Sequence, residues 1–295
     1  MSKPIDLYSV SFNKPNDNDR STYNTFNKVL EHSLERNTKN INHKIVVDEW
    51  PTEYLNNHHS DLLGNYNVNA YKLKKMIEFI KESNADKIIL SDCDVLFLDD
   101  IDEVYDKDFH IGITKHTNTP NNPYRWPYNG GVIFVKKSDL TEEFFDLFYN
   151  INLELINNPT KHRQYQKIYD GMNQAAMGCI LEEHNKNNKF NIQDIPCSKY
   201  NSCENDWPTL NPYTTKIIHY KVYLRLLLIH KLVYNNDDIY NTNKNLKRRK
   251  NDPSLKFLED LWFLYYNDYL NGTISREAED KLKRDFYNKH TLKKS

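Results

Sequence analysis

The stretch that most constrains this chain is Lys87–Leu98, in which two apolar runs enclose two aspartates. The first run, Lys87–Leu90, is short and rich in β-branched residues, as is typical of a buried strand. The polar break after it contains Asp92 and Asp94, one residue apart. Because open α/β sheets bind ligands where their strands end, we expect both carboxylates at such an edge. Hard oxygen ligands of this kind suit Mg²⁺ or Mn²⁺ together with substrate phosphates.

The alternative interpretation is that these two aspartates lie in a solvent-exposed turn and bind no metal, because short motifs often match by chance. Acids are dense just after the motif, at Asp99, Asp100 and Asp102. The apolar runs on both sides favour a metal site, since they draw the acids toward a sheet edge, where an unpaired charge is costly.

Apolar periodicity predicts alternating strands and helices before this stretch. We expect a strand at 5–12, a helix capped by Ser21 or Thr22, a strand at 44–47 and a helix at 67–81. This order predicts a parallel sheet covered by helices. Further along, the expected elements are strands at 109–114, 128–135, 190–192 and 216–218, helices at 140–156 and from 169 to about 184, and a long loop at 115–127.

The last part of the chain follows a different pattern. Residues 236–253 are rich in Asn and Asp and include the basic run Lys244–Lys250, which predicts a linker or exposed turn. Helices are expected at 255–270 and 275–290. We therefore expect a catalytic domain over 1–235 and a linker with a helical appendage over 236–295. The appendage could pack on the domain, self-associate or rest on an anionic membrane surface.

Charge and cysteine content narrow the classes of protein. The formal net charge of −1 provides no global field for nucleic acid. No run approaches the roughly 20 apolar residues of a membrane span, and the first residues contain no apolar signal core. The four cysteines form no Cys-x-x-Cys pair, so we expect reduced thiols. The expected location is the cytoplasm, either soluble or peripheral to a membrane.

Two further segments place polar or small residues beside predicted strands. Gly130 and Gly131 open an apolar strand, which indicates a close approach to the backbone or simply a tight turn. His219 directly follows the last predicted strand, with Lys221 and Arg225 close behind it. A lone histidine is more often structural than a ligand, but here the following basic residues suit a metal and pyrophosphate pocket.

Taken together, these segments resemble the nucleotide-sugar-dependent glycosyltransferases of the GT-A fold, most nearly the glycogenin-like retaining branch. The resemblance covers roughly Ile5–Arg225 and implies a Rossmann-like α/β fold with a mixed, mainly parallel sheet, flanking helices and a C-terminal helical extension. It implies that Asp92, Asp94 and His219 bind Mn²⁺ or Mg²⁺. It also implies that the nucleotide sugar is bound by Tyr8, Ser9, Ser11, Lys72 (with Lys74 or Lys75 as alternatives), Asp92, Asn129, Gly130, Gly131, Lys221 and Arg225.

The sugar pocket of the family has an Asp-Gln pair, which Asn173 and Gln174 match with one departure, Asn for Asp. A second departure is Val222, which stands at the glycine of the family's His-x-x-Gly-x-x-Lys motif. The resemblance makes Asp94, Asn173 and Gln174 candidate catalytic residues. If the reaction inverts the anomeric centre, a carboxylate base is needed, and Asp170 is the candidate.

The function implied is transfer of a hexosyl or pentosyl group from a nucleoside diphosphate sugar to a hydroxyl of a glycan, lipid-linked sugar or protein, with retention preferred. Two alternatives stay open. One is a sugar-nucleotide-binding module without activity. The other is a haloacid-dehalogenase-like phosphatase, with Asp92 as nucleophile and Asp94 as acid and base, although Leu96 stands where that motif has Thr or Val.

Overall fold

The computed structural model describes residues 4–13, 20–49, 51, 61–117, 127–204, 206–207, 210–234 and 239–291. The chain forms two compact units, and each has a hydrophobic core of its own. The first unit consists of Met1–Pro15, Asn40–Asp92 and Asp102–Cys197. The second consists of Asn16–Lys39, Cys93–Ile101 and Ser198–Ser295.

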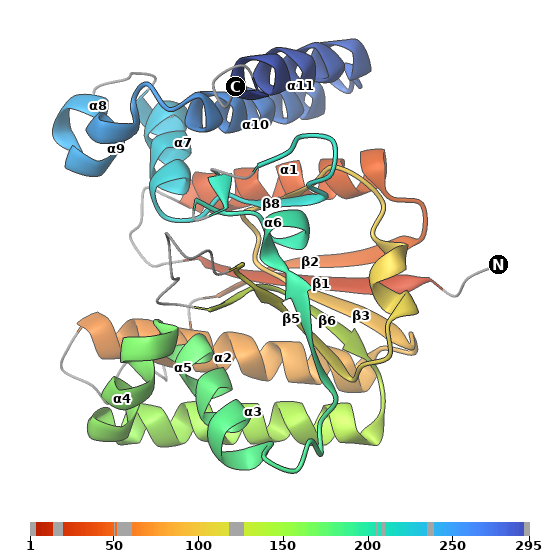
Figure 1. The fold of residues 1–295 in the computed structure, drawn as a ribbon, viewed down its shortest axis with the longest axis vertical. Coiled ribbons are helices and arrows are strands. Elements are labelled where there is room, and N and C mark those ends of the chain that lie inside the picture. The colour runs from red at the N-terminus through yellow and green to blue at the C-terminus, as the bar shows by residue number, and fades with distance from the viewer. Residues whose placement is uncertain are drawn as a thin grey trace. The chain divides into compact units, whose positions relative to one another are not determined.

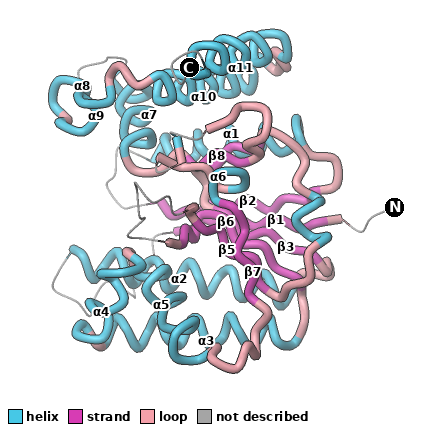
Figure 2. Tube along the Cα trace, viewed as in Figure 1, coloured by secondary structure: helices cyan, strands magenta, loops and turns pink. Residues whose placement is uncertain are grey.

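The first unit is built on a six-stranded sheet with the order β2-β1-β3-β6-β5-β7 (Figure 2). Its strands are β1 (Ile5–Asn13), β2 (Ile41–Glu49), β3 (Lys87–Ser91), β5 (Ile111–Lys115), β6 (Tyr128–Lys136) and β7 (Ile192–Pro196). β1 pairs in parallel with β2 and β3, and β5 pairs in parallel with β7, whereas β6 is antiparallel to β3 and β5. The predicted α/β class with a mixed, mainly parallel sheet is confirmed.

Helices cover one face of this sheet (Figure 1). They are α2 (Asp61–Glu82), α3 (Asp139–Asn157), α4 (Pro159–Tyr169) and α5 (Met172–Cys179), which a π-helical turn over Ile180–His184 continues. Leu73 and Ile77 of α2 and Phe144 of α3 are buried in one core with Ile88 and Leu90 of β3. Helical spacing of apolar residues therefore places α2 and α3 on the sheet.

The second unit is mainly helical. Its elements are α1 (Arg20–Asn37), β4 (Val95–Phe97), β8 (Ile217–His219), α7 (Tyr223–Tyr234), α8 (Ile239–Thr242), α9 (Lys244–Arg249), α10 (Pro253–Asn271) and α11 (Arg276–Thr291), and α6 (Cys197–Tyr200) follows β7 in the chain. Helix α10 begins with Asp252 as cap and Pro253 in its first turn, and it ends at Gly272, whose φ of 60° is the left-handed conformation that glycine favours.

Residues 236–253 are a correction to the sequence-based expectation of a linker or exposed turn. Their described part includes α8 and α9. Leu246 is fully buried in the second core, and its N–H donates to the Asn243 Oδ1 at 3.1 Å, as at a capped helix start. A short helix therefore forms within a segment whose composition suggested a loop.

Other expectations have mixed outcomes. Helix α1 begins at Arg20, ahead of the expected caps Ser21 and Thr22. Most of the expected loop at 115–127 lies outside the described residues. The apolar faces of α10 and α11 pack in the second core, as Trp262 and Phe286 show. The boundary expected after residue 235 stays a prediction. In the described part of the chain, no helix has both the length and the apolar character needed to cross a bilayer.

Candidate active site

The first group of predicted site residues lies in the second unit, around Asp94. Strands β4 and β8 are antiparallel, with Val95 opposite His219, so Asp94 emerges beside the end of β8. The Tyr220 N–H donates to the Asp94 carbonyl at 2.7 Å and fixes this position. The Asp94 side chain is 2% exposed, and its Oδ1 lies 3.3 Å from His219 Nε2. Two predicted metal ligands are therefore in contact.

Arg225 contacts the same carboxylate from the first turns of α7. Its Nη1 donates to Asp94 Oδ2 at 3.0 Å. The arginine side chain is 36% exposed, whereas Asp94 and His219 are almost completely buried. The ion pair therefore has a buried acidic side and a basic side open to solvent, where an anionic group could reach it.

The turn between β8 and α7 has a strained backbone. Val222 has a φ of 49°, in the left-handed region that β-branched residues rarely adopt. The His-x-x-Gly-x-x-Lys motif, which this segment resembles, has glycine at this position. The Lys221 N–H donates to the His219 carbonyl at 2.9 Å, and the Leu226 N–H donates to the Val222 carbonyl at 3.0 Å. These two hydrogen bonds bracket a valine held in a backbone conformation that glycine adopts without strain.

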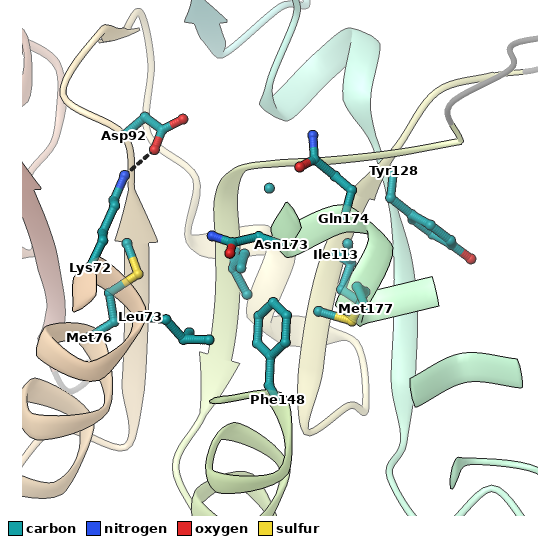
Figure 3. A pocket seen from close by; sticks show the side chains of 12 residues that line it. Lys72, Leu73, Met76, Asp92, Ile113, Tyr128, Phe148, Asn173, Gln174 and Met177 are labelled. Carbon is teal, nitrogen blue, oxygen red and sulfur yellow. Dashed lines mark hydrogen bonds and ion pairs between the residues drawn. The ribbon is translucent and has the colours of Figure 1, made fainter. Parts of the chain in front are cut away.

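The second group of predicted residues lines a pocket in the first unit (Figure 3). The lining combines a few polar groups with an apolar floor, as small-molecule sites usually do. It consists of Lys72, Leu73, Met76, Asp92, Ile113, Tyr128, Gly130, Ile133, Phe148, Asn173, Gln174 and Met177. Five of these residues, Lys72, Asp92, Gly130, Asn173 and Gln174, were predicted from the sequence, and the structure brings them together.

Lys72 and Asp92 form an ion pair at one side of this pocket (Figure 3). Asp92 directly follows β3, and its N–H donates to the Gly131 carbonyl of β6 at 2.8 Å. The side chain of Asp92 is 32% exposed. The expected position of this acid at the carboxyl end of a buried strand is confirmed by this geometry.

Asn173 and Gln174 reach the pocket because of an unusual turn before α5. Asp170 has φ 57° and ψ 172°, a region that non-glycine residues occupy at a cost of order 1–3 kcal/mol. Gly171 follows with a φ of 48°, and a Cβ atom there would lie 2.6 Å from Gln174 Oε1. Glycine is therefore required for Gln174 to take its position. Asp170 itself is not among the residues that line the pocket.

Two features of the pocket suit a polar ligand: an acceptor without a hydrogen-bond partner and open space beside a glycine. Asn173 Oδ1 is buried and has no hydrogen-bond partner among the described residues. A Cβ atom built on Gly130 would meet no atom within 4 Å. Asn129 has a structural part, since its Oδ1 accepts from the Gly131 N–H at 2.9 Å and its carbonyl accepts from Thr114 Oγ1 at 2.6 Å.

The β1 residues predicted to hold the nucleotide base differ in their surroundings. Tyr8 is buried in the first core, where its ring stacks on Phe79 with centroids 4.6 Å apart, and burial raises the pKa of Tyr8 to about 12. Ser9 is fully buried opposite Ser91 of β3. Ser11 is also buried and lies nearer the end of the strand.

Sequence reasoning missed Glu204, whose carboxyl lies near the basic residues Lys221 and Arg249. The His219 N–H donates to the Ser202 carbonyl at 2.8 Å, two residues before Glu204. Burial raises the pKa of Glu204, and the positive charges of Arg249 and Lys221 partly offset this shift. The apolar floor of the pocket, with Met76 and Phe148, was missed as well, because such residues are indistinguishable in sequence from ordinary core positions.

No protein-family model and no curated protein sequence matches this chain. Solved glycosyltransferase structures do match it. One is a glycosyltransferase involved in glycosylation of the major capsid of PBCV-1, with 13% identity, a TM-score of 0.47, and coverage of 75% of this chain and 95% of that chain. Another is apo GlyE from Streptococcus pneumoniae TIGR4, with 10% identity, a TM-score of 0.46, and coverage of 75% and 55%.

A third match is the galactosyltransferase LgtC in complex with donor and acceptor sugar analogs, with 13% identity, a TM-score of 0.44, and coverage of 74% and 87%. The chain thus spans about half the length of GlyE and most of the other two. All three TM-scores lie below 0.5, so the function proposed below is argued from the site residues. The resemblance noted in the sequence and the solved structures that match the chain name the same class, the glycosyltransferases.

Proposed function

We propose that this chain transfers a sugar from a nucleoside diphosphate sugar to an acceptor hydroxyl, with a divalent cation as cofactor. The observation that carries the proposal is the buried Asp94 carboxylate, which has His219 on one oxygen and Arg225 on the other. A metal ligand pair and a solvent-accessible cation on one carboxylate suit a site for a metal-bound diphosphate.

The Asp94 and His219 side chains fit a metal ion. An octahedral ion with ligands at about 2.1 Å holds neighbouring ligand atoms roughly 3 Å apart. The two atoms here are 3.3 Å apart. Asp92 precedes Asp94 by two positions in the chain and would supply a further carboxylate. An imidazole ligand favours a transition-metal ion such as Mn²⁺ over Mg²⁺. A bound cation would neutralise charge that develops on the departing diphosphate.

Basic side chains of the protein would share that task. The Arg225 guanidinium can form paired hydrogen bonds to phosphate oxygens, and its half-exposed position leaves it accessible. Lys221 would add positive charge near the leaving group, where preorganised charges lower the barrier. In this proposal the lysine acts electrostatically and forms no covalent bond to the sugar.

The donor sugar would occupy the pocket of the first unit. The amide groups of Asn173 and Gln174 can bind sugar hydroxyls, and the unpartnered Asn173 Oδ1 can accept one hydrogen bond. Among the described lining residues, Asp92 is the one carboxylate, and it is paired with Lys72. An inverting enzyme needs a carboxylate base at the acceptor hydroxyl, so this lining favours retention.

The test is thermal unfolding with a panel of nucleoside diphosphates and their sugars, each with Mn²⁺, Mg²⁺ or a chelator. A ligand at about one hundred times its dissociation constant adds roughly 2.7 kcal/mol of stability. We expect one base family to stabilise the protein, and only with metal. If no nucleotide does so under any condition, the proposal is wrong. Metal-dependent binding without hydrolysis or transfer would instead identify a binding module.

A further inference from the structure

The solvent-facing side of α7 is unusually apolar. Val222, Leu226 and Val233 are 40%, 39% and 37% exposed, and Ile229 is half-buried. At 3.6 residues per turn Leu226, Ile229 and Val233 lie on one side of α7, and Val222, in the turn just before the helix, accepts from the Leu226 N–H at 3.0 Å. We call these four residues the α7 stripe. The opposite side of α7, with Leu224, Leu227 and Leu228, is fully buried in the second core. Both sides of this helix are therefore apolar.

A row of lysines lies next to this helix. Helix α9 contacts α7, and the Arg249 guanidinium at its end lies 5.9 Å from the ring of Tyr223, the first residue of α7 (Figure 1). The exposed residues of the row are Lys244, Lys247 and Lys250, spaced three apart and so on one side of this short segment. We call them the α9 lysines.

The charge in this region is segregated from the rest of the chain. Residues 221–250 contain eight Lys or Arg and two Asp, a net charge of +6, whereas the whole chain has a net charge of −1. Arg225 and Lys231 are paired with Asp94 and Glu259. The α9 lysines have no carboxylate partner among the ion pairs of the described residues.

We propose that the α7 stripe and the α9 lysines form a surface that binds an anionic lipid bilayer. An exposed apolar helix face bordered by basic residues is the pattern of helices that lie in the headgroup region. Lysines near such a surface are each worth about a fivefold gain in binding. A protein partner would need matching acids, whereas an anionic bilayer supplies negative charge and an apolar interior together.

The location of this surface gives the proposal a consequence for catalysis, which rests on the function proposed above. Arg225 contacts Asp94 and immediately precedes Leu226 of the α7 stripe. A bilayer bound to the stripe would therefore lie beside the Asp94 group. The acceptor would then be a hydroxyl of a molecule anchored in the membrane.

The test is co-sedimentation of the full chain with vesicles, without nucleotide, so that it does not depend on glycosyl transfer. The vesicles are of phosphatidylcholine alone or mixed with an equal amount of phosphatidylglycerol. We expect binding to the anionic vesicles, weakened when salt is raised from about 0.1 M to about 0.5 M. The double variant Leu226→Glu/Val233→Glu should bind at least about tenfold more weakly.

The matched control is Leu270→Glu/Ile274→Glu, which changes two exposed apolar residues, 58% and 56% exposed, one in the last turn of α10 and one in the segment after it. It should bind within about twofold of the wild type. For charge, Lys247→Gln/Lys250→Gln should weaken binding roughly tenfold or more, while Lys281→Gln/Lys289→Gln on α11 should not.

Three outcomes would overturn the proposal: no binding of the wild type to anionic vesicles at low salt, equal loss in the test and control variants, or dimerisation of the wild type that Leu226→Glu/Val233→Glu abolishes. The third would make the α7 stripe an interface between two copies of the chain. Urea unfolding of every variant shows that each is folded.

Discussion

The second unit contains two groups in which an arginine is paired with a buried carboxylate, and they differ in how far the arginine is exposed to solvent. In one, Arg36 of α1 is paired with Asp268 of α10 and Glu279 of α11. In the other, Asp94 is paired with Arg225 and contacts His219. The Arg36 side chain is 0% exposed, whereas that of Arg225 is 36% exposed.

The carboxylates of the Arg36 group are also saturated by other donors. Asp268 accepts from the Ser275 N–H at 2.9 Å, from Ser275 Oγ at 2.6 Å and from Thr273 Oγ1 at 3.0 Å. Glu279 accepts from Tyr265 at 3.2 Å. A closed group of this kind joins three helices and offers no position to a ligand. The Asp94 group is open on its arginine side, and that difference separates a structural ion pair from a candidate site.

The largest effect is expected when the closed group loses its cation. Arg36→Met removes the cation from the buried Asp268 and one of the cations from Glu279, which keeps Lys283 at 2.6 Å. Removing one partner of a buried ion pair typically costs about 3–5 kcal/mol of unfolding free energy. Urea unfolding measures this. The matched control is Lys28→Met on the same helix, whose pair with Glu31 is exposed and should contribute no more than about 0.5 kcal/mol. If Arg36→Met and Lys28→Met lower the unfolding free energy by similar amounts, the Arg36 group does not stabilise the fold as a closed group should.

A substitution in the Asp94 group should change the stabilisation by ligand more than the stability of the protein without ligand. Asp94→Asn removes the proposed metal ligand, while Arg225, whose side chain is 36% exposed, can turn to water. We expect the metal-dependent stabilisation by nucleotide, about 2.7 kcal/mol at saturating ligand, to disappear while the variant stays folded. Thermal unfolding with nucleoside diphosphate and Mn²⁺ measures it, and Asp99→Asn, an exposed acid nearby, is the control. A full metal-dependent shift in Asp94→Asn would exclude this carboxylate as a ligand.

Sequence patterns predicted the acids of the Asp94 group but not the Arg36 group. The apolar run of β3 and the spacing of Asp92 and Asp94 are local, so strand and acids were predicted together. The Arg36 group was not predicted, because its partners lie 232 and 243 residues away along the chain. The same holds for the contact between Arg225 and Asp94, which are 131 residues apart and were assigned only separate parts.

Helices α4 and α7 were missed for opposite reasons. The sequence of α4, PTKHRQYQKIY, is polar on most positions, and that of α7, YLRLLLIHKLVY, is apolar on most positions. Helix α7 lacks the alternation of apolar and polar faces from which a helix is predicted, and the buried face of α4, formed by His162, Tyr165 and Tyr169, contains no aliphatic residue. Their helical form depends on what packs against them, and a single sequence does not contain that information.

A smaller effect is expected from the strained turn at the edge of the open group. Val222→Gly should raise the unfolding free energy by up to about 1 kcal/mol, because left-handed backbone costs a β-branched residue about 1–2 kcal/mol and glycine returns part of this as chain entropy. Denaturant unfolding measures it. Val222→Asn, which tolerates the same φ, should show part of the gain, and a loss of stability in both variants would show that the valine side chain matters more than the backbone.

The smallest effect is on the pH dependence of the unfolding free energy, to which Asp268 and Glu204 should contribute with opposite signs. Burial raises the pKa of Asp268, but hydrogen bonds from Ser275 and Thr273 and the charge of Arg36 outweigh it and leave that pKa below 3.8. Its contribution to stability is therefore complete above pH 3.8 and is lost as the pH falls through the lowered value. Glu204, near Lys221 and Arg249, has a pKa raised above 4.5, chiefly by burial. Its folded form retains the proton, so its contribution is complete below pH 4.5 and declines as the pH rises through the raised value.

Urea unfolding from about pH 3 to about pH 8 checks both signs. Asp268→Asn should flatten the acid side of the stability profile, and Glu204→Gln should flatten the decline above pH 4.5 and gain stability relative to the wild type at neutral pH. If Glu204→Gln leaves the neutral side unchanged, the Glu204 carboxylate is hydrated in solution and the open group extends further toward solvent than its burial indicates. The cost of keeping this acid buried would then be absent, and Glu204 would be available to interact with Lys221 in its charged form.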